Sequence, residues 1–340
     1  MEPVAVYYHP LFVEHETGSH PESKMRLMVA KQVLEESDLS LDWQTPRPAT
    51  EDEVARVHDH GYIAQVRSLA ESGGGWLDAD TIVSPKSYEA ALFAAGAGIM
   101  AVEKALTDGQ KAFLLVRPPG HHAVRDQGMG FCLFNNIAIA ATHALEECGA
   151  GRVLIVDWDV HHGNGTQDAF YADPRVLFFS MHQLHHYPGT GSAGEVGTAE
   201  GQGFTINVPV RRGAGDGAVR LAFESLLLPV AREFKPDIVL VSAGYDCQEG
   251  DALGGLTFSQ DAFQWMGATL AELCRESGAA GPVIFLEGGY MPMAEACSIV
   301  ATIEGIQGKK PAFTKAASEG EQADVGAAVE EAKARWRNAF

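Results

Sequence analysis

The sequence predicts one α/β domain, with an open parallel β-sheet covered by helices on both faces. Short apolar runs rich in β-branched residues alternate along the chain with longer segments that have helical periodicity. The apolar runs are continuous rather than alternating, which is typical of strands buried on both faces of a parallel sheet. No internal repeat and no Ser/Gly-rich linker divides the 340 residues, so we expect a single domain.

The expected strands follow one another as six apolar runs, at residues 4–8, 111–116, 152–160, 176–181, 237–244 and 282–289. Apolar residues recur at helical spacing in three segments between them, at 87–109, 135–151 and 218–234. The end of the chain differs, because residues 309–326 are polar. A single helical stripe overlaps and follows them, formed by Val325, Val329, Ala332 and Trp336. We expect a main domain over 1–308 and a segment, 309–340, whose helix packs on that domain or on a partner subunit.

Composition and charge exclude several classes of protein. The net charge of −20 argues against a general nucleic-acid surface, and it favours solubility or a cationic substrate. No apolar stretch approaches the roughly 20 residues that cross a bilayer, and the amino terminus lacks the basic and apolar regions of a signal peptide. Five scattered cysteines without a C-x-x-C pair fit free thiols in a reducing compartment. We expect a cytoplasmic protein that binds neither nucleic acid nor membrane.

Four polar clusters follow four of the expected strands. They read RPPGHHA at 117–123, DWDVHH at 157–162, SAGYD at 242–246 and LEGGY at 286–290. In open parallel sheets, ligands bind beyond the carboxyl ends of the strands. Because all four clusters fall at that edge, we expect them to meet at one site.

The second cluster contains the side chains of a metal site. On a strand, Asp157, Asp159 and His161 point to one face, because side chains alternate. The two carboxylates repel each other, and a divalent cation removes that repulsion. Asp246 offers another ligand from a distant part of the chain, and a catalytic zinc site needs three protein ligands and an open position. Ferrous iron fits the same donors, and an ion-paired strand end without a metal is the alternative.

Adjacent histidines follow the Pro-Pro-Gly turn of the first cluster. Neighbouring side chains rarely face one ion, so His121 and His122 suit proton transfer better than metal binding. Tyr290, in the last cluster, could donate a hydrogen bond to an oxyanion beside a metal, although most Gly-Gly-aromatic turns are only turns. The residues therefore indicate a catalytic metal site with its own acid–base groups.

Taken together, five ordered motifs closely resemble those of the histone deacetylase superfamily, in particular its class II branch and the bacterial deacetylase-like amidohydrolases. The motifs are RPPGHHA, GMGFCLFNN, DWDVHHGNGTQDAF, SAGYDCQEGDALGG and LEGGY. The match runs from about residue 5 to 308, with HPESKMRL and VHDHGYI near its start. The resemblance implies the arginase/deacetylase-like open parallel sheet, and a deacetylase catalytic domain over residues 1–308.

The resemblance also implies which residues hold the metal and act on the substrate. One catalytic zinc ion would be held by Asp159, His161 and Asp246. The tandem histidines would be His121 and His122, and the tyrosine that polarises the carbonyl would be Tyr290.

Supporting residues follow from the same resemblance. Asp157 would hydrogen-bond His121, and Asn164 would support His122 at a position where class I relatives have Asp. His162 is expected to be structural, because its ring lies on the face opposite His161. A structural potassium ion would lie near Asp157, Asp159, His161, Ser180 and Met181.

The implied reaction is the hydrolysis of an N-acetyl or N-acyl amide to an amine and acetate by a metal-activated water. His122 would take a proton from that water, and the histidine pair would protonate the leaving amine. A narrow substrate tunnel would be lined by Phe131, Tyr187, Leu253 and Gly130. Asp80, in the loop before the helix at 87–109, would hydrogen-bond the substrate backbone.

Three alternatives differ in their sequence signals. Arginases share the fold but hold two manganese ions with extra carboxylates, and this chain has Gly163 and Gly244 at those positions. A catalytically silent binding protein would have lost Tyr290 or a metal ligand, and all are present. Polyamine deacetylases carry either a Glu where this chain has Leu253 or a long insertion for which residues 76–92 leave no room. Acyl-lysine is therefore the preferred substrate, acetylpolyamines or other small acetylated amines are the alternative, and a homo-oligomer is left open.

Overall fold

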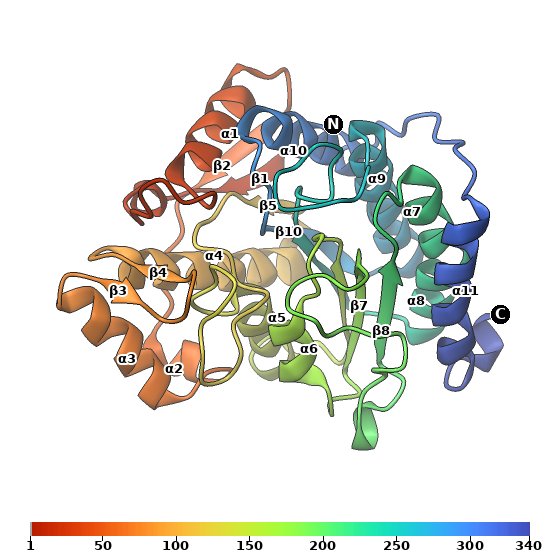
Figure 1. The fold of residues 1–340 in the computed structure, drawn as a ribbon, viewed down its shortest axis with the longest axis horizontal. Helices are drawn as coiled ribbons and strands as arrows, with labels where there is room; N and C mark the ends of the chain where they lie inside the picture. Colours follow the sequence, from red (N-terminus) through yellow and green to blue (C-terminus); the bar gives the residue numbers. More distant parts are fainter. Residues whose placement is uncertain (1) are drawn as a thin grey trace.

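A computed structural model describes residues 2–340, and its centre is a large parallel sheet (Figure 1). Within those residues eight strands lie in the order β2-β1-β5-β10-β9-β6-β7-β8, and every neighbouring pair is parallel. Their bounds are β1 Val4–Tyr7, β2 Leu41–Gln44, β5 Ala112–Leu114, β6 Val153–Asp157, β7 Val176–Gln183, β8 Thr205–Val210, β9 Ile238–Ala243 and β10 Ala280–Leu286. The open parallel sheet expected from the sequence is confirmed.

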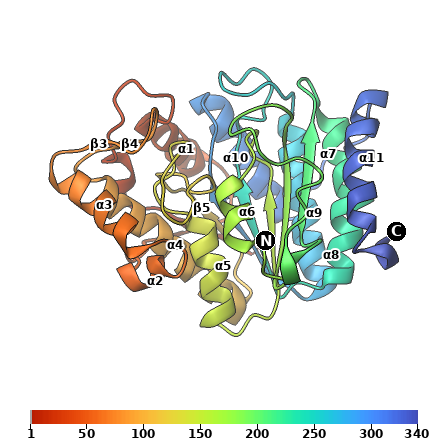
Figure 2. The same cartoon turned by 60° about the horizontal axis from the view of Figure 1, so that its bottom comes forward.

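Helices cover both faces of this sheet (Figures 1 and 2). One face carries α4 (Ser87–Asp108), α5 (Asn136–Glu146) and α6 (Asn164–Phe170). The other carries α1 (Lys24–Glu36), α9 (Gln260–Ser277) and α10 (Pro292–Ile306), with α8 (Leu228–Phe234) beside α9 and α7 (Asp216–Ala222) further toward the side where the chain ends. Smaller elements complete the fold outside these layers, namely α2 (Glu51–Ala55), α3 (His60–Glu71) and the antiparallel pair β3 (Gly75–Trp76) and β4 (Ile82–Val83).

Several elements differ from the expectation. The run at 152–160 ends as a strand at Asp157, because the next residues bend away from the sheet to form the site. The helix at 218–234 contains a π-helical turn at Phe223–Leu227. Both edge strands, β2 and β8, were missed, and so were α1, α9 and α10. Edge strands lack a neighbour on one side, and β2 is partly exposed, so its sequence LDWQ lacks the apolar run of a central strand.

The expectation that no apolar stretch is long enough to cross a bilayer was wrong for α4. This helix has 22 residues and an apolar window with a mean hydropathy of 1.4. Twelve of its residues are buried, most of them alanine, and the helix lies against β5 and β10. Its composition is therefore that of a core helix, which is hydrophobic because it is surrounded by protein.

The last helix, α11 (Glu319–Lys333), covers the edge of the sheet at β8 (Figure 2). A capping box of Ser318 and Glu321 begins it. Val325 and Ala332 are buried, and the indole Nε1 of Trp336 donates a hydrogen bond to the Gly203 carbonyl at 2.8 Å. The stripe seen in the sequence thus covers a strand edge that would otherwise be open to pairing.

Candidate active site

Two carboxylates and one imidazole meet beyond the carboxyl ends of β6 and β9. Asp159, His161 and Asp246 are buried, and each offers a ligand atom within 4.8 Å of the other two. The Nδ1 atom of His161 lies 3.0 Å from Asp159 Oδ1 and 3.2 Å from Asp246 Oδ2. The three side chains come from segments 85 residues apart, and the adjacent pairing of β6 with β9 brings them together.

This cluster has the properties of a cation site. Asp246 Oδ2 is buried without a well-aligned hydrogen bond, because the His161 Nδ1 atom, 3.2 Å away, bonds Asp159 Oδ1 instead. Asp246 Oδ1 accepts a hydrogen bond from the Val160 backbone N–H. Burial and the charge of Asp159 raise the pKa of Asp246 to about 7. A buried carboxylate oxygen that lacks a donor is costly, and a divalent cation between the three side chains would satisfy it. The donors present therefore fit a metal with oxygen and imidazole ligands.

Two glycines make room for these carboxylates. A Cβ atom on Gly288 would lie 2.1 Å from Asp246 Oδ2. A Cβ atom on Gly244 would lie 2.0 Å from Asp159 Oδ2. Both distances are far below van der Waals contact, so any side chain at either position would displace a carboxylate of the cluster.

The tandem histidines lie beside this cluster, and each has a partner that orients its ring. His121 Nδ1 donates to Asp157 Oδ2 at 2.9 Å, and His122 Nδ1 donates to Asn164 Oδ1 at 2.7 Å. The Asn164 amide nitrogen faces the His122 carbonyl at 3.3 Å, which fixes its oxygen toward the ring. Since the Nδ1 of His122 carries the proton, its Nε2 is free to accept one.

The two rings have opposite acid–base properties. Burial alone would lower the pKa of His121, but the carboxylates of Asp157, Asp159 and Glu287 raise it to about 10. Burial lowers the pKa of His122 well below its usual value, and the charges of His121 and His161 add to this effect. A protonated imidazole therefore lies next to a neutral one, an arrangement that provides an acid and a base together.

Tyr290 faces the same space from the loop after β10. Its backbone N–H donates to Asp251 Oδ2 at 2.8 Å, and its ring lies 5.2 Å from the Arg26 guanidinium. Burial and the charge of Asp246 raise the pKa of the phenol well above its usual value, so the hydroxyl stays protonated. Arg26 Nη2 also donates to the Glu287 carbonyl at 2.6 Å, which holds the loop in place.

A cavity of about 220 Å³ joins these groups to the surface. Tyr187 lies edge-on to His122, with 5.1 Å between ring centroids, and Phe131 lies edge-on to Tyr290 at 5.9 Å. Gly130 has φ +54°, and a Cβ atom there would lie 2.4 Å from His122 Cδ2. The lining includes all the residues expected for the tunnel, namely Phe131, Tyr187, Leu253, Gly130 and Asp80.

The residues expected around potassium also lie together. Asp157 is paired in register with Ser180 on β7, and both are fully buried. The Ser180 hydroxyl lies 2.9 Å from His182 Nδ1. His162 lies apart from the cavity, where its ring nitrogens bond Thr190 and Gln167.

Sequence reasoning missed a buried charge network beneath the site. Glu22 accepts hydrogen bonds from Arg117 and Arg26, and although burial opposes ionisation, the two arginines hold the pKa of Glu22 at about 2. Glu287 accepts from the backbone N–H groups of Gly120 and His121, at 2.7 and 3.2 Å. The i, i+4 spacing of Glu22 and Arg26 was the available signal. However, Arg117 lies 95 residues from Glu22 along the chain, and Glu295 lies 269 residues from Arg26.

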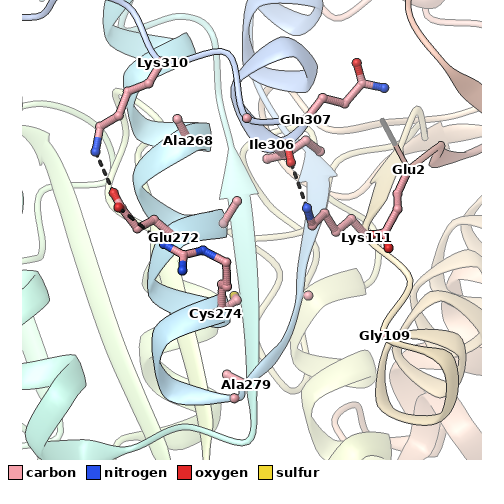
Figure 3. Close-up of a pocket in the computed structure, with 15 residues that line it drawn as sticks. Glu2, Gly109, Lys111, Ala268, Glu272, Cys274, Ala279, Ile306, Gln307 and Lys310 are labelled. Atoms are coloured by element: carbon pink, nitrogen blue, oxygen red, sulfur yellow. Dashed lines mark hydrogen bonds and ion pairs between the residues drawn. The ribbon is translucent and has the colours of Figure 1, made fainter.

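A larger cavity, of about 590 Å³, lies at the opposite edge of the sheet, where β5 and β10 begin (Figure 3). Lys310 Nζ bonds Glu272 at 2.8 Å, and Lys111 Nζ donates to the Ile306 carbonyl at 3.0 Å. Both ammonium groups already have a hydrogen-bond partner, and none of the candidate catalytic residues lines this cavity. Size alone does not identify the site, and the chemistry lies in the smaller cavity.

The buried carboxylates, the paired histidines and the protonated tyrosine at this strand edge provide the kinds of group that a hydrolase uses. Comparison with known proteins agrees. The histone deacetylase domain matches residues 20–306. The chain is 37% identical to a histone deacetylase-like amidohydrolase from Pseudomonas aeruginosa, over 86% of this chain and 77% of the relative. It is 41% identical to the polyamine deacetylase HDAC10 from Homo sapiens, over 77% of this chain and 40% of the relative.

The crystal structure of the HDA15 HD domain superposes with a TM-score of 0.93, at 34% identity, over 99% of this chain and 96% of that one. The chain therefore belongs to the histone deacetylase family, and it is an enzyme of the deacetylase and amidohydrolase class. The fold expected from the motifs is confirmed, and so is the reaction class.

Proposed function

We propose that the protein is a zinc-dependent deacetylase that hydrolyses N-acetyl or N-acyl amides of lysine side chains. The observation that carries this proposal is the buried cluster of Asp159, His161 and Asp246, in which Asp246 Oδ2 has no well-aligned hydrogen bond. Through His161 this cluster borders the cavity that both tandem histidines and Tyr290 also line. When bound by these three residues, a zinc ion would lower the pKa of a water molecule and polarise the amide carbonyl.

The acid–base work is done by the chain's own residues. His122 Nε2 takes the proton of the attacking water, since its Nδ1 already donates to Asn164. The Tyr290 hydroxyl donates to the carbonyl oxygen as negative charge develops there. The proton that His122 took from the water then passes to the nitrogen of the leaving amine, which returns His122 to its neutral form. His121, held protonated by Asp157, supplies a positive charge beside this transfer.

A single catalytic metal is supported by the two glycines at the positions where arginases carry further carboxylates. A Cβ atom on Gly163 would lie 2.2 Å from Asp157 Oδ2, and one on Gly244 would be as close to Asp159. A second set of ligands therefore has no space here. Ferrous iron in place of zinc, structural potassium at Asp157 and Ser180, a cytoplasmic location and a homo-oligomer stay predictions.

The substrate is proposed from the wall of the cavity. Leu253 is apolar where a gatekeeping carboxylate would recognise the second amine of a polyamine, and this favours the slender alkyl chain of acyl-lysine. The alternative, an acetylpolyamine or another small acetylated amine, is supported by the likeness to the human polyamine deacetylase and by the Asp80 carboxylate in the cavity lining.

Acetate release should be compared for acetyl-lysine peptides, acetylspermidine and acetylputrescine. We expect kcat/KM to be highest for the peptides, and a preference for the polyamines would overturn the argument from Leu253. The Tyr290→Phe variant should bind zinc with unchanged stoichiometry and lose kcat by about 10²- to 10³-fold. Near-normal turnover in that variant would contradict the proposed role of the hydroxyl.

A further inference from the structure

His186 is a further residue of the cavity that contains the tandem histidines and Tyr290. It precedes Tyr187 in the segment between β7 and β8, and it lines the same 220 Å³ cavity. Its ring lies nearly parallel to that of His161, with 4.8 Å between centroids and 16° between planes. The residue before it, His185, has φ +56°, a conformation that costs free energy in a residue with a Cβ atom.

The imidazole of His186 joins two walls of the cavity. Its Nε2 lies 2.8 Å from the Leu253 carbonyl oxygen, and a carbonyl oxygen only accepts hydrogen bonds. Nε2 therefore carries the proton and acts as the donor. This bond connects the segment that bears Tyr187 to the loop that follows the metal-site residue Asp246.

The connection continues from Leu253 to the candidate catalytic tyrosine. The Leu253 N–H donates to Asp251 Oδ1 at 2.9 Å, and the Tyr290 N–H donates to Asp251 Oδ2 at 2.8 Å. Asp251 is 8% exposed, so both bonds are shielded from water. Three hydrogen bonds thus lead from the His186 ring to the Tyr290 backbone.

We infer that His186 is a positioning residue that, through Leu253 and Asp251, sets the spacing of the cavity walls and the placement of Tyr290. The inference rests on the proposed function, because it concerns how that site selects its acyl group. With the His186 bond in place, the walls admit the small acetyl amide. Without it, the Leu253 wall and the Tyr290 loop gain freedom, so longer acyl groups enter and acetyl is held less well.

Two variants distinguish the contribution of the His186 Nε2–H donor from that of the His186 ring. His186→Phe keeps a flat ring beside His161 and removes the donor, whereas His186→Gln keeps an N–H donor at the position of Nε2 without the ring. Acetyl-lysine and butyryl-lysine peptides serve as substrates, and the ratio of their kcat/KM values is the readout. We expect the ratio of acetyl to butyryl to fall by about fivefold or more in the Phe variant. The Gln variant should stay within about twofold of the unmodified protein.

Hydrogen exchange gives a readout that needs no turnover. The Tyr290 amide should exchange about tenfold faster in His186→Phe, and also in Asp251→Asn, which retains only one acceptor oxygen. If the unmodified protein hydrolyses neither peptide, the proposed function fails, while the exchange rates still test the positioning role.

Asp251→Asn tests the same chain of bonds should His186→Phe fail to fold. The inference is overturned if Tyr290 exchange in the folded variant stays within twofold of the unmodified protein. It is equally overturned if the acyl ratio of His186→Phe matches that of the unmodified protein.

Discussion

Glu287 is the buried carboxylate on which the backbone of the tandem histidines depends. Its Oε2 accepts from the N–H groups of Gly120 and His121, and its Oε1 accepts from the Ser242 hydroxyl at 2.9 Å. Replacement by Leu fills a similar volume but leaves both backbone N–H groups buried without an acceptor. Each such group costs about 1–3 kcal/mol, so Glu287→Leu should lower the free energy of unfolding by about 2–6 kcal/mol.

The matched control is Glu287→Gln, whose carbonyl oxygen can still accept from both N–H groups while the Ser242 hydroxyl turns to accept from its amide. We expect it to lose less than about 2 kcal/mol. Urea unfolding followed by tryptophan fluorescence measures both variants against the unmodified protein. The reasoning is refuted if Glu287→Leu lies within about 1 kcal/mol of the unmodified protein, or if the two variants are equally destabilised.

Two further predictions concern pH. Asn164→Asp places a carboxylate beside His122 Nδ1 and should raise the pKa of His122. The acidic limb of the kcat/KM profile should therefore move to higher pH by about one unit or more. A limb that does not move would exclude His122 as the base. His58 is buried and neutral, with its pKa lowered to about 4 by burial, and its Nε2 accepts from the Asn135 N–H at 2.9 Å. The unfolded chain therefore takes up a proton that the folded chain does not, and the stability present above pH 6.5 should fall by on the order of 3 kcal/mol between pH 6.5 and 4. His58→Gln should flatten this part of the melting-temperature profile, and an equally steep profile would show that the ring does not titrate on unfolding.

The location of the site was predictable because it follows from strand direction. All neighbouring strands in the sheet are parallel, so their carboxyl ends lie at one edge. The loops after β6 and β10 therefore meet there, although they are far apart in the sequence. The same parallel direction predicted that Asp159 and Asp246 would lie close together. The strand expected over 152–160 ends at Asp157, so Asp159 and His161 are placed by the loop after β6 and not by strand alternation.

The support beneath the site could not be read from the sequence. Glu22, Arg26 and Arg117 are each ordinary surface residue types, and they are buried here only because they neutralise one another. In the sequence, likewise, nothing distinguishes His186 from the two other histidines that precede Tyr187. Its role depends on a carbonyl 67 residues away, and no local pattern signals that contact.

The central claim is that one metal ion, held by Asp159, His161 and Asp246, supports hydrolysis of an acyl-lysine amide. The most direct measurement is acetate release from an acetyl-lysine peptide by protein stripped with a chelator and then titrated with zinc. We expect activity to return in proportion to zinc and to level off at one equivalent, and Asp246→Asn to bind and respond far more weakly. Activity that is unaffected by stripping, or that needs two equivalents, would contradict the claim.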